Sequence, residues 1–200
     1  MKKLLTCTLL LALLPLSANA MKLQLLGSSS KLSYDIVKHL PIVGSVPVHG
    51  DLTPASASTL KGLLTTSDAA DASGLYFVSG EIDLQKPEFV TDSEIRDQHV
   101  RDMIDGNGIV VQVVNVRSSA QIGEQQNATV SLTINGITLP VPLTYSLFIV
   151  RQGAKSAVTM RGQMIVDRSK FNMSIHGIAG TGDFLIDKNF VLKLELPFRN

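Results

Sequence analysis

The densest group of side chains that could do chemistry lies in residues 87–105, which read PEFVTDSEIRDQHVRDMID. Seven consecutive positions there hold Arg96, Asp97, His99, Arg101 and Asp102. This cluster could meet the head group of a ligand, or it could be the solvated face of a helix with an Asp97–Arg101 pair at i,i+4. A metal site of His99 with Asp97 or Asp102 is a weaker interpretation, because no second histidine lies nearby in the sequence.

Nucleophiles and general bases are sparse elsewhere. Cys7 is the only cysteine, there is no G-x-S-x-G elbow, and the four histidines (His39, His49, His99 and His176) are scattered. The glycines of residues 177–182 (GIAGTG) predict a turn, because no βαβ pattern surrounds them. We predict no catalytic residue. A small barrel enzyme that acts on a lipid, with a histidine as general base, stays open as an alternative.

Alternation of polar and apolar residues indicates the elements that position this cluster. Val130, Leu132 and Ile134 share one strand face, and Asn135-Gly136 predicts a hairpin, because both positions of a type I′ turn need positive φ. The return strand places Ile137, Leu139, Val141, Leu143, Tyr145 and Leu147 on the same face. Pro140 and Pro142 lie two residues apart, so both lack an N–H toward the same neighbour and the other ladder is preserved.

Further stretches agree with a β protein. Residues 158–166 and 192–196 alternate in the same way, and residues 75–84 and 31–38 are strand candidates. Residues 109–116 are apolar almost throughout, as for a strand covered on both sides or capped at one end. Seven to nine antiparallel strands with few helices are expected, which is typical of an all-β barrel or sandwich.

The polar strand faces carry Lys, Glu, Arg and many Thr, which favours an aqueous exterior and an apolar interior over an outer-membrane barrel. An eight-stranded barrel has an interior that side chains just fill or that holds one ligand. A packed core and a ligand cavity therefore both stay open. If there is a cavity, its predicted lining is Tyr34, Ile36, Val130, Leu132, Ile134, Leu139, Val141, Leu143, Tyr145, Leu147, Val158, Met160, Met164, Phe171, Leu192 and Leu194.

A short helix is expected to carry the polar cluster across one end of the barrel. Thr91 to Glu94 resembles a capping box, in which the two side chains satisfy backbone N–H groups of the first turn. Ile95, His99 and Met103 then share one helical face, which we expect to pack on the barrel.

The N-terminus and the composition bound the class of protein. Residues 1–20 combine Lys2-Lys3, an apolar run and Ala18-Asn19-Ala20, which predicts a cleaved secretory signal peptide, too short for a transmembrane anchor. The predicted mature domain, residues 21–200, would carry a formal charge of −1, because the signal removes two lysines and no acid from a +1 chain. That charge excludes a dedicated nucleic-acid binder. The mean hydropathy of +0.22 then reflects the signal and an apolar interior.

Five motifs resemble those of the YceI-like periplasmic lipid-binding proteins. Glu94–Met103 (EIRDQHVRDM) looks like the family's RD-x-H-L run, and residues 34–39 (YDIVKH) are similar to its aromatic-x-x-x-K-H strand. Residues 79–84 (SGEIDL), 131–138 (SLTINGIT) and 166–171 (VDRSKF) resemble three further segments. The motifs occur in the family's order over residues 31–196.

The resemblance implies an extended lipocalin-like antiparallel barrel with a long apolar cavity for a polyisoprenoid, quinone or fatty-acid-like molecule, and a homodimer as a further expectation. It implies that Arg96, Asp97 and His99 order the barrel mouth, with head-group contact second. We therefore predict a non-catalytic periplasmic carrier of an isoprenoid or other long-chain amphiphile, with no cofactor and no metal. The alternatives are an envelope stress or structural protein without a bound lipid and, less favoured, the lipid-modifying enzyme.

Overall fold

The computed structural model describes residues 20–85, 87–104, 108–119, 121, 123–152, 155–174 and 185–200. Residues 1–19 of the predicted signal peptide, with Cys7, lie outside these ranges, as do His176 and the turn predicted at residues 177–182. No helix in the described ranges is long and apolar enough to cross a membrane.

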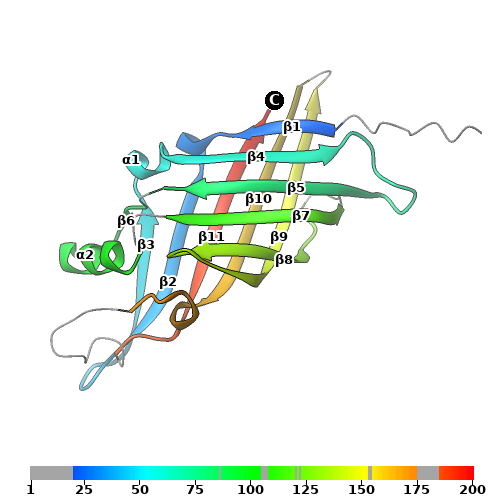
Figure 1. Cartoon of the computed structure of the whole chain (residues 1–200). Coiled ribbons are helices and arrows are strands. Elements are labelled where there is room, and N and C mark those ends of the chain that lie inside the picture. Colours follow the sequence, from blue (N-terminus) through cyan, green and yellow to red (C-terminus); the bar gives the residue numbers. More distant parts are fainter. Residues whose placement is uncertain are drawn as a thin grey trace, which may run out of the picture.

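The described residues form eleven strands and two α-helices (Figure 1). The strands are β1 (Ala20–Leu25), β2 (Lys31–Leu40), β3 (Gly44–Leu52), β4 (Leu60–Ser67), β5 (Leu75–Leu84), β6 (Phe89–Val90), β7 (Ile109–Ser119), β8 (Gln126–Ile134), β9 (Ile137–Gln152), β10 (Lys155–Asp167) and β11 (Asn189–Arg199). The helices are α1 (Pro54–Ala57) and α2 (Glu94–Met103), and 3-10 turns occupy Gly27–Ser29 and Arg168–Phe171.

Eight strands close into an antiparallel barrel, which confirms the predicted fold class. The order around the barrel is β1-β4-β5-β7-β8-β9-β10-β11, and β11 closes it by pairing Phe198 with Leu25 and Arg199 with Gln24 of β1. In Figure 1, β4, β5, β7 and β8 cross in front of β9, β10 and β11 at a steep angle, as in an orthogonally packed barrel.

Three more strands extend this barrel at one end. β2 pairs with the first half of β11, β3 pairs with β2 along its length, and the short β6 pairs with β3. We call β2, β3 and β6 the annex. The total of eleven strands exceeds the predicted seven to nine because the annex adds three strands to the closed ring of eight.

The hairpin predicted at Asn135-Gly136 is confirmed. β8 and β9 pair from Ile134–Ile137 outward, and both turn residues have positive φ, 52° for Asn135 and 72° for Gly136. Pro140 and Pro142 lie opposite β8, whereas the pairing of β9 with β10 begins only at Leu143. The prolines therefore occupy the part of β9 where the second ladder has not yet started, which is how the strand accommodates them.

Period-two burial holds along most strands, with one correction. The predicted inward residues of β8, β9, β10 and β11 join one apolar core that also includes Leu23, Phe89 and Phe198. Residues 109–116, by contrast, are not covered on both sides: within β7, Val111 is buried but Gln112 is exposed and Val114 is 68% exposed. β7 is thus an ordinary barrel strand that presents a valine to solvent.

Helix α2 lies at the end of the barrel, as predicted, and His99 and Met103 of its predicted face are partly buried, but its first turn and the position of Ile95 differ from the prediction. Ser93 is the N-cap, and its side chain makes no capping hydrogen bond, so Thr91 and Glu94 do not form a capping box. Ile95 is 72% exposed, whereas Asp97 and Val100 are buried. The buried face therefore includes Asp97 and Val100 beside His99 and Met103, and it leaves out Ile95 because Asp97 is held against the fold.

Candidate ligand-binding site

An apolar pocket of about 80 Å³ lies between the annex, helix α2 and the end of the barrel. The pocket has three walls. One is formed by β2, β3 and β6, the second by α2 and the start of β7, and the third by the turn after β10 and the start of β11. The lining residues are Tyr34, Ile36, Lys38, Val48, Phe89, Arg96, His99, Val100, Met103, Ile104, Ile109, Arg168, Met173, Ile186, Phe190 and Leu192.

Tyr34 forms a rigid part of the pocket wall. Its ring crosses the annex over Gly50, its partner on β3, where a Cβ would come within 2.3 Å of the ring. The ring also meets Phe89 edge-on, with centroids 5.3 Å apart and planes at 86°. Burial, and secondarily the negative charge of Asp97, raise the pKa of Tyr34 to about 12. The phenol therefore stays neutral at physiological pH.

Apart from the neutral phenol of Tyr34, the ionisable residues in the described lining are all basic. They are Lys38 from β2, Arg96 and His99 from α2, and Arg168 from the turn after β10. Arg96 pairs with Asp92 at 2.6 Å, but the side chains of Lys38 and His99 have no hydrogen-bond or ion-pair partner among the described residues. Two cationic or hydrogen-bonding groups are thus available at the mouth of an apolar pocket.

Arg168 is a buried structural cation. Its guanidinium donates hydrogen bonds from Nε to the carbonyl of Asp187 (3.0 Å), from Nη1 to that of Met173 (2.9 Å) and from Nη2 to that of Ile186 (3.3 Å). A buried arginine needs such acceptors, because an unpaired charge in the interior is strongly destabilising. Arg168 therefore ties the turn after β10 to the segment that leads into β11.

Asp97 acts as a clamp on the chain that enters α2. One carboxylate oxygen accepts a hydrogen bond from the backbone N–H of Thr91 and another from its hydroxyl, both at 2.7 Å. The predicted Asp97–Arg101 pair does not form, since Arg101 donates to Gln98 instead. This placement of Asp97 is consistent with the prediction that it orders the barrel mouth. That this ordering serves ligand binding stays a prediction.

The predicted cavity-lining residues divide into two groups. Tyr34, Ile36 and Leu192 line the pocket. The other residues pack in or against the barrel core away from it, and several are 2% exposed or less. They are Val130, Leu132, Ile134, Leu139, Val141, Leu143, Tyr145, Leu147, Val158, Met160, Met164, Phe171 and Leu194. That these thirteen contact a ligand stays a prediction.

The sequence did hold signals for some of the lining residues that went unnamed. Lys38 follows Tyr34 and Ile36 at period two, so it shares their strand face. Arg168 lies in the motif of residues 166–171, and Val100 follows the RD-x-H run directly. Val48, Ile186 and Phe190 carry no such signal, because only their pairing with β2 brings them to the pocket: Val48 lies on β3, Phe190 on β11, and Ile186 forms a bridge with Lys38.

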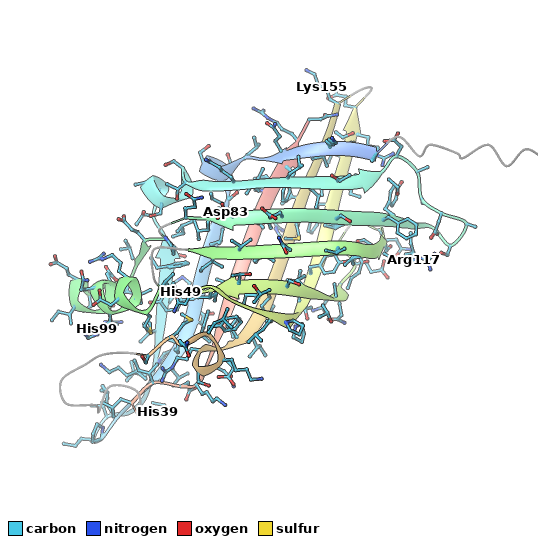
Figure 2. All side chains as sticks on the ribbon, in the orientation of Figure 1. His39, His49, Asp83, His99, Arg117 and Lys155 are labelled. Carbon is cyan, nitrogen blue, oxygen red and sulfur yellow. The ribbon has the colours of Figure 1, made fainter. Side chains whose placement is uncertain are left out.

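Two other histidines lie outside the pocket. His49 is held by Asp35 (Nδ1 to Oδ1, 2.7 Å) and Asp51 (Nε2 to Oδ1, 3.1 Å) on the outer face of the annex. The bond to Asp35, with added attraction from Asp51, raises the pKa of His49. His39 contacts Ser45 (3.0 Å) and Asp187 (2.6 Å) near the tip of the β2–β3 hairpin. Figure 2 shows His39 and His99 at the same end of the molecule, with Lys155 and Arg117 at other extremities.

The chemistry of the pocket favours binding. Its described lining contains no serine, threonine, cysteine, aspartate or glutamate, and His99 is its one histidine. No group of three or more histidine, cysteine or acidic side chains suited to a metal occurs in the described ranges. An apolar wall with a basic mouth suits an amphiphile whose head group is anionic or accepts hydrogen bonds.

A closed antiparallel barrel with helix α2 and an apolar pocket at one end is a lipocalin-like fold. The model of the YceI-like domain matches residues 24–198, and the chain belongs to this family. The resemblance drawn from the five sequence motifs is thereby confirmed.

Two solved structures share the fold. The crystal structure of BcnA from Burkholderia cenocepacia is 20% identical, with a TM-score of 0.52, and the match covers 86% of this chain and 97% of that one. A polyisoprenoid binding domain from Saccharophagus degradans, implicated in plant cell wall breakdown, is 14% identical with a TM-score of 0.54, covering 88% and 97% of the two chains. No curated protein matches this chain.

Proposed function

We propose that this protein binds and carries an isoprenoid or another long-chain amphiphile in the periplasm, without catalysis. The observation that carries the proposal is the apolar pocket whose ionisable lining residues among the described ones, apart from the neutral phenol of Tyr34, are all basic. The tail would enter between Ile36 and Leu192, and the head group would meet Lys38 and His99. Membership of the YceI-like family and the polyisoprenoid binding domain with the same fold support this function.

The size of the pocket sets a condition on the mechanism. At about 80 Å³ it is smaller than an engineered cavity of about 150 Å³ that admits benzene. A long tail therefore requires side chains at the barrel end to part. Met103 and Met173 line the pocket and are suited to this, because methionine is unbranched and repacks easily. Burial of a tail at about 25 cal/mol per Å² supplies the driving force.

Native mass spectrometry of protein purified from the periplasm tests the proposal. The expected result is a second species heavier than the free chain by the mass of one defined lipid. A ligand-free spectrum that stays unchanged after addition of quinones and fatty acids would overturn the proposal. The same spectra report the oligomeric state and so test the predicted homodimer. N-terminal sequencing shows whether the chain begins at Met21, as the predicted signal cleavage requires.

A lipid-free envelope protein is the second candidate, and the packed interior of the barrel favours it. Leu132, Ile134 and Val166 are fully buried in the core, so the barrel needs no ligand to fill it. A ligand-free protein that nevertheless accumulates under envelope stress would support this candidate. Turnover of added lipids that is lost in His99→Ala would instead favour the enzymatic alternative.

A further inference from the structure

The tip of the β2–β3 hairpin exposes apolar side chains where a solvent-facing turn usually carries polar ones. The nine residues from Leu40 to Val48 (LPIVGSVPV) contain no charge. Ile42 is fully exposed and Val43 is 72% exposed, so these side chains contribute nothing to the core. Figure 1 shows this hairpin extending past the barrel at the end that carries α2.

The tip belongs to the same end of the molecule as the pocket. Lys38, four residues before Ile42, lines the pocket. Two contacts hold the β2–β3 hairpin in place: the backbone N–H of Asp187 donates a hydrogen bond to the carbonyl of Val37 (2.9 Å), and the Asp187 carboxylate contacts His39. On the other side of the pocket, α2 exposes Ile95, which directly precedes the lining residue Arg96. Ile42, Val43 and Ile95 are the most exposed large apolar residues in the described ranges.

We propose that the hairpin tip inserts into the interfacial layer of a phospholipid bilayer, with Ile95 as a second contact, so that the pocket mouth faces the membrane. The inference rests on the proposed function for its purpose, which is transfer of the amphiphile between bilayer and pocket. Insertion suits this tip because Leu40 pairs with Gly44, so the turn brings few unpaired backbone groups into the apolar layer.

A bilayer fits the tip better than a protein partner does. A stable protein interface needs about 800 Å² on each side, and a turn with two apolar side chains supplies only a fraction of that. The charges nearby are mixed: Lys38 and Arg96 stand close to Asp92, Glu94 and Asp187. We therefore expect apolar insertion to dominate, with only a modest gain from anionic lipid.

Tryptophan fluorescence tests the insertion directly, because the chain contains no tryptophan. Ile42→Trp should shift its emission to the blue when vesicles of phosphatidylcholine are added, and lipids brominated along the acyl chain should quench it. The matched control is Ile165→Trp, which replaces another exposed isoleucine (65%) on the outer face of β10. No shift in Ile42→Trp, or an equal shift in both variants, would overturn the inference.

Vesicle co-sedimentation supplies the second test. The double substitution Ile42→Ser/Val43→Ser should weaken binding to phosphatidylcholine vesicles about tenfold or more, because two apolar side chains lose their burial. Val114→Ser/Ile165→Ser removes an exposed valine and an exposed isoleucine from the barrel wall and should leave binding unchanged. Vesicles with added phosphatidylglycerol test the role of charge. Binding that occurs only with this anionic lipid would also overturn the inference.

Two further measurements separate this inference from the proposed function. Binding of a soluble short-chain quinone, measured without vesicles, should be equal in wild type and Ile42→Ser/Val43→Ser. If the protein binds the quinone but not the vesicles, insertion is contradicted and the proposed function stands. If it binds the vesicles but not the quinone, only the proposed function is contradicted. Loss of a dimer in Ile42→Ser/Val43→Ser, seen by analytical ultracentrifugation, would mean that a second copy covers the tip and would overturn the inference.

Discussion

Asn135 shows how one residue can be essential to a turn and to the packing around it. Its positive φ suits the hairpin between β8 and β9. Its side-chain amide also donates to the carbonyl of Met103 (2.8 Å) and to that of Phe171 (3.1 Å). The hairpin is thereby tied to the end of α2 and to the turn after β10, both of which border the pocket.

Asn135→Asp should destabilise the protein by about 1–3 kcal/mol, because two carbonyls then face a carboxylate that cannot donate. Urea denaturation measures the change in the free energy of unfolding. Asn135→Gly is the informative control, since it keeps the turn conformation and removes the side chain altogether. Equal stability of wild type and Asn135→Asp would show that the two hydrogen bonds contribute nothing.

The proposed function requires Lys38 to contact the head group of the ligand. Lys38→Ala should weaken binding of a fatty acid about tenfold, because the carboxylate loses a cation at the pocket mouth. Fluorescence displacement titration measures the effect. Lys61→Ala, on the exposed face of β4, is the control and should bind like wild type. An unchanged affinity in Lys38→Ala would place the head group elsewhere.

At the scale of elements, the pairing of His49 with Asp35 and Asp51 makes the annex sensitive to pH. The pKa of His49 is raised above its ordinary 6.5 by the bond to Asp35, so its stabilising effect is complete below pH 6.5 and is lost as the pH rises through the raised value. The pKa of Asp35 is lowered, first by Lys193 and also by His49, so its contribution is present above its ordinary 3.8 and is lost in acid.

His49→Asn should therefore lower the unfolding free energy by up to about 1 kcal/mol at pH 6 and by less at pH 9, since exposed ion pairs are weak. Denaturation curves at the two pH values measure this difference. His99→Asn is the control, because no carboxylate among the described residues contacts His99. A destabilisation that is the same at both pH values would contradict a role for the His49 charge.

Local elements could be predicted from the sequence, whereas their assembly could not. The β8–β9 hairpin follows from Asn135-Gly136 and period-two alternation, which act within a few residues of the turn. On the predicted face of α2, His99 and Met103 line the pocket but Ile95 is exposed, because Asp97 is held by Thr91, a contact that apolar periodicity does not encode. The annex went unrecognised because β2 pairs with β11, which is more than 150 residues away in the sequence.

At the scale of the whole molecule, the same distinction applies to the site. Alternation correctly placed residues such as Leu132, Leu143 and Met164 inside the barrel. It could not say where the interior is open, since that depends on how the annex, α2 and the turn at Arg168 close one end. A strand face predicts which side chains point inward, but only the complete arrangement determines which of them leave space.

The position of the pocket leads to a test in which stability and binding separate. Leu143→Glu should unfold the barrel, at a cost of more than about 4 kcal/mol, because Leu143 is 2% exposed in the packed core and lies outside the pocket. Ile36→Trp should stay folded and fill the pocket, because Ile36 is only partly buried there. Circular dichroism distinguishes the two outcomes.

Thermal unfolding with ligand then reports on the site of binding. A quinone at about 100 times its Kd should stabilise wild type by about 2.7 kcal/mol and raise its Tm by roughly 5–10 °C. Ile36→Trp should show little or no rise, whereas Ile165→Trp, which adds the same ring outside the barrel, should behave like wild type. If the ligand raises the Tm of Ile36→Trp as much as that of wild type, the pocket is dispensable for binding. The amphiphile would then occupy the barrel interior near Leu143 and Met160, as the sequence pattern predicts.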